Sequence, residues 1–318
     1  MSLPLLLALA TSALAAPPSS DTVTLRFDPT AAPTTTLRCT SDREKRQGAQ
    51  TTTQHLEMRA VYTIEPVGRA WAQGAASLEV LAFSADPAPP PGTPSMDSLF
   101  ARIDPILPRL LVDARGRWKG IEPVDQPAIE AALKGFLTEG GLSPEIAARA
   151  WGAMAPAFSS EGLTERMRES WYADIGHWLD RTLAVGTSEL GTSKKKDPFP
   201  VGTALTWSAS RRVMCDGSGK VAGAPDCVEL RLEARLPAAA VKEQNDTQMA
   251  TLAQAAGIEL GAITFVGGSS VTTWIAVVDP DTLAARRTER RRVTDTEVSI
   301  GGRSFVMGTL DTFACVAE

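Results

Sequence analysis

The chain is poor in the residues that most often carry catalysis. It has 318 residues but only two histidines and two tyrosines, so any Ser–His nucleophilic pair or imidazole metal site is limited to His55 and His177. His55 begins a strand-like segment and His177 lies between aromatic residues, which is typical of surface or packing positions. The HExxH and EF-hand motifs are absent, and no P-loop or GxGxxG stands between a strand and a helix. We therefore expect no catalytic residues, no metal and no cofactor.

A second long apolar run is also lacking. The first, Leu3–Leu14, is too short for a membrane-spanning helix of roughly 20 apolar residues. It ends in the small-x-small pattern Ala13–Ala16, which predicts a signal peptide over residues 1–16. No cysteine follows to accept a lipid anchor. We expect residues 17–318 to be exported to the periplasm or the extracellular space, and not to be an integral membrane protein.

An excess of positive charge is missing as well. The formal net charge is −5, which predicts solubility and no general affinity for nucleic acid. Arginine far outnumbers lysine, Asn245 is the one asparagine, and Ala, Gly and Pro are abundant. This bias is typical of a GC-rich bacterial genome.

The four cysteines favour disulfides over metal ligation. An even number in an exported protein is typical of a disulfide framework, and no CxxC or CxxxH spacing is present. Of the three possible connectivities we favour Cys215–Cys227, because it closes a short polar loop between two strand-like segments. The remaining pair is then Cys39–Cys315, and closing so long a loop stabilises a protein by roughly 4–5 kcal/mol in the chain-entropy model.

Two-residue periodicity indicates antiparallel strands over much of the chain. Residues 55–65 alternate clearly, with one apolar face consisting of Leu56, Met58, Ala60, Tyr62 and Ile64. Residues 75–84 are expected to complete a hairpin with this segment, and residues 110–118 to form another. Later strands are predicted at 228–236, 271–278 and 283–293, followed by a hairpin turn at Gly301-Gly302.

Helical spacing appears between these strand-like regions. It covers 127–137, 143–155 and 163–183, with Ser143 as an N-cap, and returns at 238–256. The sequence thus predicts one α+β domain over 17–318, built on a large, mostly antiparallel curved sheet. Residues 20–122 and 200–318 are its β-rich parts, and a helical insert at 125–185 packs on the sheet.

Tryptophans are the first candidates for ligand contacts. Trp171 and Trp178 fall on the helix-like segment 163–183, whereas Trp207 and Trp274 fall on strand-like segments. They either line a cavity between sheet and helices, where apolar ligands bind, or fill the seam where helices cover the sheet. The second interpretation is favoured, because large aromatic residues dominate ordinary protein cores.

Residues 286–292 contain five arginines. On a strand they divide between two faces, with Arg286, Arg290 and Arg292 on one and Arg287 and Arg291 on the other. Guanidinium groups this close repel one another unless carboxylates or anionic ligands neutralise them. The favoured interpretation is an exposed strand beside acidic residues such as Glu297 and the Glu229/Glu233 row. The alternative is a patch for anionic envelope material such as lipid phosphate or polysaccharide.

Two short motifs carry a resemblance to a known group of proteins. Phe199–Trp207 contains P-V-G-x-x-x-x-W before a strand, and Val112–Arg117 precedes a helical stretch. With the order of elements, the chain resembles secreted bacterial envelope proteins and lipoproteins of unknown function, although it lacks the lipobox cysteine that many of them carry. The resemblance implies a sheet curved around helices, as in lipoprotein-carrier folds, and transfers no catalytic residues.

These observations favour a non-enzymatic envelope protein that binds an apolar or amphiphilic ligand, such as a lipid. A structural module with an envelope protein partner is the alternative, and an extracytoplasmic hydrolase is a third hypothesis. The hydrolase would require His177 to meet a serine and a carboxylate in one cleft.

Overall fold

The computed structural model describes residues 21–89, 94–195, 197–215, 227–256, 263–300 and 303–318. The predicted signal peptide, the polar loop within the Cys215–Cys227 disulfide and the turn at Gly301-Gly302 lie outside the described residues.

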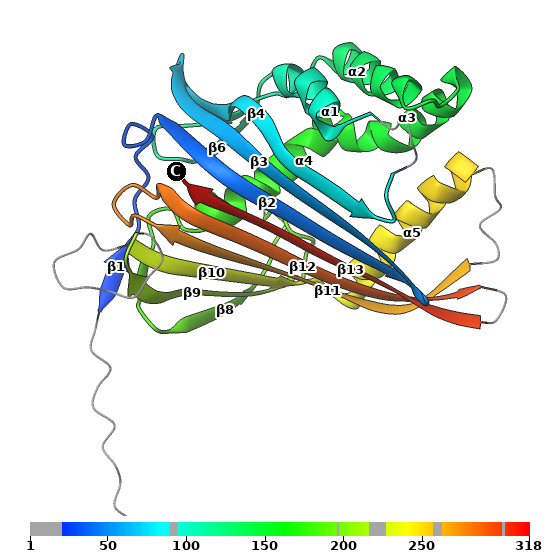
Figure 1. Cartoon of the computed structure of the whole chain (residues 1–318). Helices are drawn as coiled ribbons and strands as arrows, with labels where there is room; N and C mark the ends of the chain where they lie inside the picture. The colour runs from blue at the N-terminus through cyan, green and yellow to red at the C-terminus, as the bar shows by residue number, and fades with distance from the viewer. Residues whose placement is uncertain (1–20, 90–93, 196, 216–226, 257–262, 301–302) are drawn as a thin grey trace, which may run out of the picture.

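A large antiparallel sheet dominates the fold, as the sequence predicts (Figure 1). Eleven strands pair in the order β6-β5-β4-β3-β2-β13-β12-β11-β10-β9-β8. Their bounds are β2 Thr34–Gln47, β3 Gln50–Val67, β4 Ala70–Asp86, β5 Leu110–Val112, β6 Trp118–Ile121, β8 Ser188–Thr192, β9 Ala204–Val213, β10 Cys227–Arg235, β11 Ile263–Val278, β12 Ala285–Ile300 and β13 Arg303–Ala317. β2, which comes first in the sequence among the strands of this sheet, therefore lies in the middle of the sheet, beside β13.

The predicted hairpins are confirmed, and several strands are longer than the alternation suggests. β3 pairs with β4, and β5 pairs with β6. β11 begins at Ile263, eight residues before the predicted strand. The prediction began too late because Gly267, Gly268 and Ser269 give no alternating apolar signal. A sheet can extend through such residues when the neighbouring strand supplies the hydrogen-bonding partners.

The helices follow the sequence pattern at three of four places. Helices α2 (Gln126–Glu139), α3 (Pro144–Phe158) and α5 (Ala238–Ala256) match the predicted ranges closely. Ser143 caps α3 by accepting a hydrogen bond from the backbone N–H of Ile146 at 3.3 Å. A short helix not predicted, α1 (Met96–Ile103), precedes β5.

The helix predicted over 163–183 is too long. Helix α4 covers Ser160–Trp171 and continues as the π-helical turn η2, Tyr172–Gly176. The chain then turns, with Asp180 at a φ of 57°, into strand β7 (Thr182–Ala184), which pairs with β1 (Thr22–Thr24). The apolar spacing continued past the helix because Trp178 and Leu183 are both buried. The apolar periodicity correctly indicated that these two residues are buried, but it did not show that they lie outside the helix.

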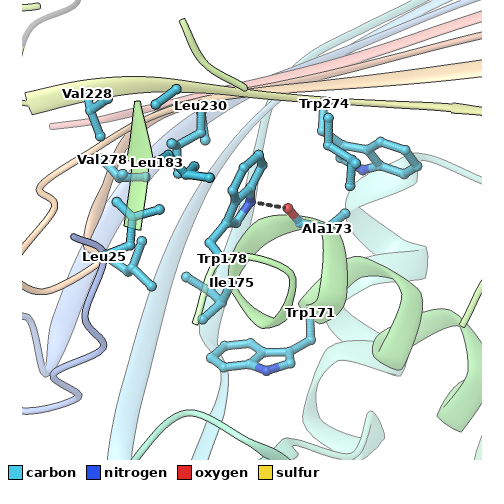
Figure 2. Packing of buried hydrophobic residues seen from close by; sticks show 14 of the residues in the cluster. Leu25, Trp171, Ala173, Ile175, Trp178, Leu183, Val228, Leu230, Trp274 and Val278 are labelled. Carbon is cyan, nitrogen blue, oxygen red and sulfur yellow. Dashed lines mark hydrogen bonds between the residues drawn. The ribbon is translucent and has the colours of Figure 1, made fainter. Parts of the chain in front are cut away.

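The main core lies between the sheet and the segment from α4 to β7 (Figure 2). On the sheet it includes Leu230, Leu232 and Trp274, which define the helix-facing side of the sheet. Trp178 is 1% exposed, and its indole N–H donates to the carbonyl of Ala173 at 2.9 Å. A second cluster around Ile129 joins helices α1 to α4 to one another.

Both predicted cysteine pairs are disulfides. Cys39 on β2 lies directly opposite Cys315 on β13, with a sequence separation of 276 residues. Cys215 and Cys227, separated by 12 residues, link the end of β9 to the start of β10. Two disulfides are consistent with an exported protein.

Candidate functional site

Two adjoining cavities lie between the helix-facing side of the sheet and α4 with η2. The first, the apolar cavity, has a volume of about 300 Å³. Its lining includes Leu37, Tyr62, Ile64, Trp171, Ile175 and Phe313. Strands β2, β3 and β13 thus form one wall, and the helical segment forms the other.

The second, the polar cavity, has a volume of about 500 Å³. Its charged lining residues are Arg43, Arg166, Glu169, Arg290, Arg292 and Asp311. Ser170 and Phe313 line both cavities, so the two spaces meet at the C-terminal end of α4. Ser170 and Arg290 are exposed, and the site is therefore open to solvent.

Strand register arranges the sheet wall in rows. One polar row crosses β11, β12, β13, β2 and β3: Thr272, Arg292, Asp311, Arg43 and Gln54. The next row is mostly apolar: Trp274, Arg290, Phe313, Ser41, Leu56 and Phe83. The apolar cavity lies further along β2 and β13, at Leu37 and Cys315. The wall becomes less polar from Arg292 towards Leu37.

The helical wall carries polar side chains at intervals of four residues, Arg166, Ser170 and Asp174. Residues at this spacing share one face of a helix. The hydroxyl of Ser170 donates to the carboxylate of Asp174 at 3.2 Å. Burial raises the pKa of Asp174 from 3.8 to about 6, although Ser170 and Arg290 oppose the shift. Burial also raises the pKa of Glu169, against the attraction of Arg292 and Arg290.

The four arginines of the polar cavity differ in the groups that their guanidinium groups contact. Arg43 pairs with Asp311 at 3.0 Å. The guanidinium of Arg166 donates to the carbonyls of Gly162 and Ala157 at the helix itself. In contrast, Arg290 lies 5.9 Å from the ring centroid of Phe313, and Arg292 donates to the amide oxygen of Gln244 at 3.4 Å. Within the described residues, neither Arg290 nor Arg292 forms an ion pair.

The structure separates the four candidate tryptophans. Trp171 lines the apolar cavity and Trp274 the polar one. Trp178 is enclosed in the core, outside the helix in which it was predicted. Trp207 packs on the core beside His177, with ring centroids 4.9 Å apart, and its indole N–H donates to Glu189 at 2.9 Å.

The candidate arginines also divide. Arg290 and Arg292 face the polar cavity, whereas Arg286 is exposed at the irregular register between β11 and β12. The expected neutralisation by the Glu229/Glu233 row is wrong, because that row is on β10, two strands away from β12. Its glutamates pair with other arginines: Arg211 with Glu229, and Arg231 and Arg235 with Glu233. On the opposite face of β12, Arg287 pairs with Glu289 at 3.3 Å.

His177 occupies an aromatic environment and is 4% exposed. Its Nδ1 is 3.0 Å from the hydroxyl of Tyr172, and its buried Nε2 has no hydrogen-bonding partner among the residues that the structure describes. Burial, reinforced by Arg181, lowers its pKa from 6.5 to about 3. The hydrolase hypothesis requires His177 to contact a serine and a carboxylate. The hydrogen-bonding contact that its Nδ1 makes is with the hydroxyl of Tyr172 instead. Among the described residues no group of three or more His, Cys, Asp or Glu is placed to hold a metal ion.

Sequence reasoning missed the helical wall of the site. The four-residue spacing of Arg166, Ser170 and Asp174 was visible, but a polar stripe on a helix ordinarily indicates a face towards solvent. It also missed Arg43 and Asp311, because their proximity to Arg292 depends on the pairing of β2, β13 and β12.

Comparison with known proteins identifies no family. No protein-family model and no curated protein matches this sequence. Among solved structures, a lipovitellin described for its lipid–protein interactions is 8% identical, with a TM-score of 0.40 over 90% of this chain. The chain spans 25% of that lipovitellin chain.

A second solved structure is the outer membrane protein OmpT of Vibrio cholerae with loop L8 deleted. It is 8% identical, with a TM-score of 0.18 over 90% of this chain and 99% of its own. Within the part of the chain that the structure describes, no helix combines the length and apolar character needed to cross a membrane.

Proposed function

We propose that this protein is a non-enzymatic, exported binding protein that holds an apolar or amphiphilic ligand in the two adjoining cavities. In this proposal the sheet curves around α4 and η2, and the ligand lies between them. The observation that carries the proposal is the pair of connected cavities at the seam between sheet and helix, where an ordinary core would be closed.

Cavity size supports this interpretation. Protein interiors contain few voids larger than a water molecule, whereas ligand sites typically enclose about 300–1,000 Å³. The cavities of about 300 and about 500 Å³ are in this range. Their lining combines aromatic and aliphatic side chains with a limited set of charged groups, which is the usual composition of a small-molecule site.

The test uses a neutral apolar probe and a pair of matched substitutions. Thr35 lines the apolar cavity, and Thr36 is the next residue on β2, whose side chain points to the other face. Thr35→Trp is expected to fill the cavity and to weaken binding of N-phenyl-1-naphthylamine roughly tenfold or more, because the probe loses its apolar contacts. Thr36→Trp is the control and is expected to bind as the wild type does.

Mass spectrometry of the protein purified gently from its native host, intact and after solvent extraction, provides a second test. A stoichiometric small amphiphile supports the proposal. An empty protein in repeated preparations, together with equal probe binding by both tryptophan variants, would overturn it. That result would favour the alternative of a structural module with an envelope protein partner.

A further inference from the structure

The charged groups of the polar cavity are unequally compensated. Four arginines and two carboxylates line it. Asp311 is held by Arg43, and the guanidinium of Arg166 is occupied by helix carbonyls. Arg290 and Arg292, two residues apart on one face of β12, retain unshared positive charge on the sheet wall. Guanidinium groups this close repel each other, and an oxyanion between them would relieve the repulsion.

The nearby carboxylates do not fulfil this role. Glu169 lines the same cavity as both arginines but is not in an ion pair with either one in the described part of the chain. The same burial that raises the pKa of Glu169 and Asp174 makes each of them easier to protonate than an exposed acid. The polar cavity is lined by four arginines and only two carboxylates, so its lining carries an excess of positive charge.

The two cavities form a gradient of polarity along the strands. Arg43, in the polar row, and Thr35, at the apolar cavity, are eight residues apart on β2. This separation corresponds to about 27 Å at roughly 3.4 Å per residue of strand. An elongated molecule can therefore lie along β2 with its two ends in different environments.

We infer that the ligand is an amphiphile with an anionic phosphate or carboxylate head group, bound by Arg290 and Arg292 in the polar cavity, with its hydrocarbon chain in the apolar cavity beside Trp171. This inference rests on the proposed function and adds the charge and the orientation of the ligand. Arginine suits the role, because its planar guanidinium forms two parallel hydrogen bonds to an oxyanion.

Isothermal titration calorimetry with dodecyl phosphate, dodecyl maltoside and inorganic phosphate, each below any critical micelle concentration, separates the contributions. The two dodecyl probes share a chain and differ in head-group charge. Wild-type protein is expected to bind dodecyl phosphate roughly tenfold or more tightly than dodecyl maltoside, because charge-assisted bonds to the head group add to the shared apolar contacts. Inorganic phosphate, which lacks the chain, is expected to bind much more weakly.

A charge-matched pair of double variants locates the head group. Arg290→Gln with Arg292→Gln is expected to lower the affinity for dodecyl phosphate roughly tenfold more than the affinity for dodecyl maltoside, and so to remove the preference. Arg287→Gln with Arg291→Gln removes the same net charge from the opposite face of β12 and is expected to keep the preference. Near-ultraviolet circular dichroism of each variant checks that the core is intact.

The outcomes separate this inference from the proposed function. Equal affinity of the wild type for both dodecyl probes would refute the anionic head group and leave the binding function in place. Equal loss of preference in both double variants would refute the assignment to Arg290 and Arg292. Inorganic phosphate binding as tightly as dodecyl phosphate would identify a free-anion site and refute the amphiphile. If neither dodecyl probe binds, the proposed function itself is wrong.

Discussion

His177 provides a direct test of the structure through the pH dependence of stability. Its pKa is about 3 in the folded protein and 6.5 when unperturbed. Between these values the unfolded chain binds a proton that the folded protein does not. The free energy of unfolding therefore rises with pH in this window. The contribution of neutral His177 is fully present above pH 6.5 and is lost as the pH falls towards 3.

The magnitude follows from the size of the shift. A difference of roughly 3.5 pKa units at about 1.36 kcal/mol each is about 5 kcal/mol. Domains are commonly stable by roughly 5–15 kcal/mol, so this single imidazole accounts for a large share of acid sensitivity. The physical cause is burial among aromatic rings: the centroids of Trp178 and Trp207 are 5.0 and 4.9 Å from that of His177.

The perturbation is His177→Phe, which keeps an aromatic ring and removes the titrating group. At pH 8 the variant is expected to be about 1 kcal/mol less stable than the wild type, because the hydrogen bond with Tyr172 is lost. As the pH falls below 6.5 the variant is expected to overtake the wild type. Urea unfolding at several pH values from 4 to 8, followed by tryptophan fluorescence with the disulfides intact, measures the difference. A difference that stays constant over this range would refute the reasoning.

Three further predictions concern stability. For Asp174 the pH dependence of stability has the opposite sign to that for His177. Its pKa of about 6 in the folded protein exceeds 3.8, so ionisation of Asp174 lowers the free energy of unfolding as the pH rises through this window. Asp174→Asn is expected to raise stability at pH 8 by up to about 3 kcal/mol and to have little effect at pH 4, with no gain at pH 8 contradicting this account. Replacing both cysteines of the Cys39–Cys315 disulfide by Ala is expected to lower stability by about 5 kcal/mol, against about 3 kcal/mol for the Cys215–Cys227 disulfide, because the closed loop is longer. Urea midpoints in the reverse order would count against this. Gly116→Ala is expected to lower stability by roughly 1–3 kcal/mol more than Gly48→Ala. Both glycines have positive φ, but a Cβ at Gly116 would meet an aromatic side chain at 2.8 Å, whereas a Cβ at Gly48 would meet no atom within 4 Å. Equal thermal unfolding midpoints of the two variants would contradict this prediction.

Local signals predicted much of the fold. The alternation at Leu56, Met58 and Tyr62 identified β3 and its apolar face, and Ser143 marked the start of α3 because capping involves only neighbouring residues. The disulfides followed from cysteine number and spacing. Each of these features depends on residues close in sequence or on simple counting.

The site could be predicted only in part. Alternation placed Arg290 and Arg292 on one face of a strand, which is their arrangement at the polar cavity. The neighbours predicted for these arginines were wrong, because the sequence of a single strand does not determine the order of strands in the sheet. Glu229 is on β10, whereas Asp311 lies directly opposite Arg292. The polar cavity depends on the register of β11, β12, β13, β2 and β3 together, and no local pattern encodes that register.

The pairing of β2 with β13 has a consequence for the order of events during synthesis. Strands β2, β3 and β4 are made early, and β8 to β12 later, but the two groups are joined in the sheet through β13. A ribosome that has released residues up to 300 has produced both halves of the sheet without the strand that connects them. The two halves of the sheet, and the Cys39–Cys315 bond between β2 and β13, can therefore join only after β13 has been made. Long-range pairing of this kind also slows folding. A nascent chain of this design keeps the two halves of its sheet apart until β13 emerges.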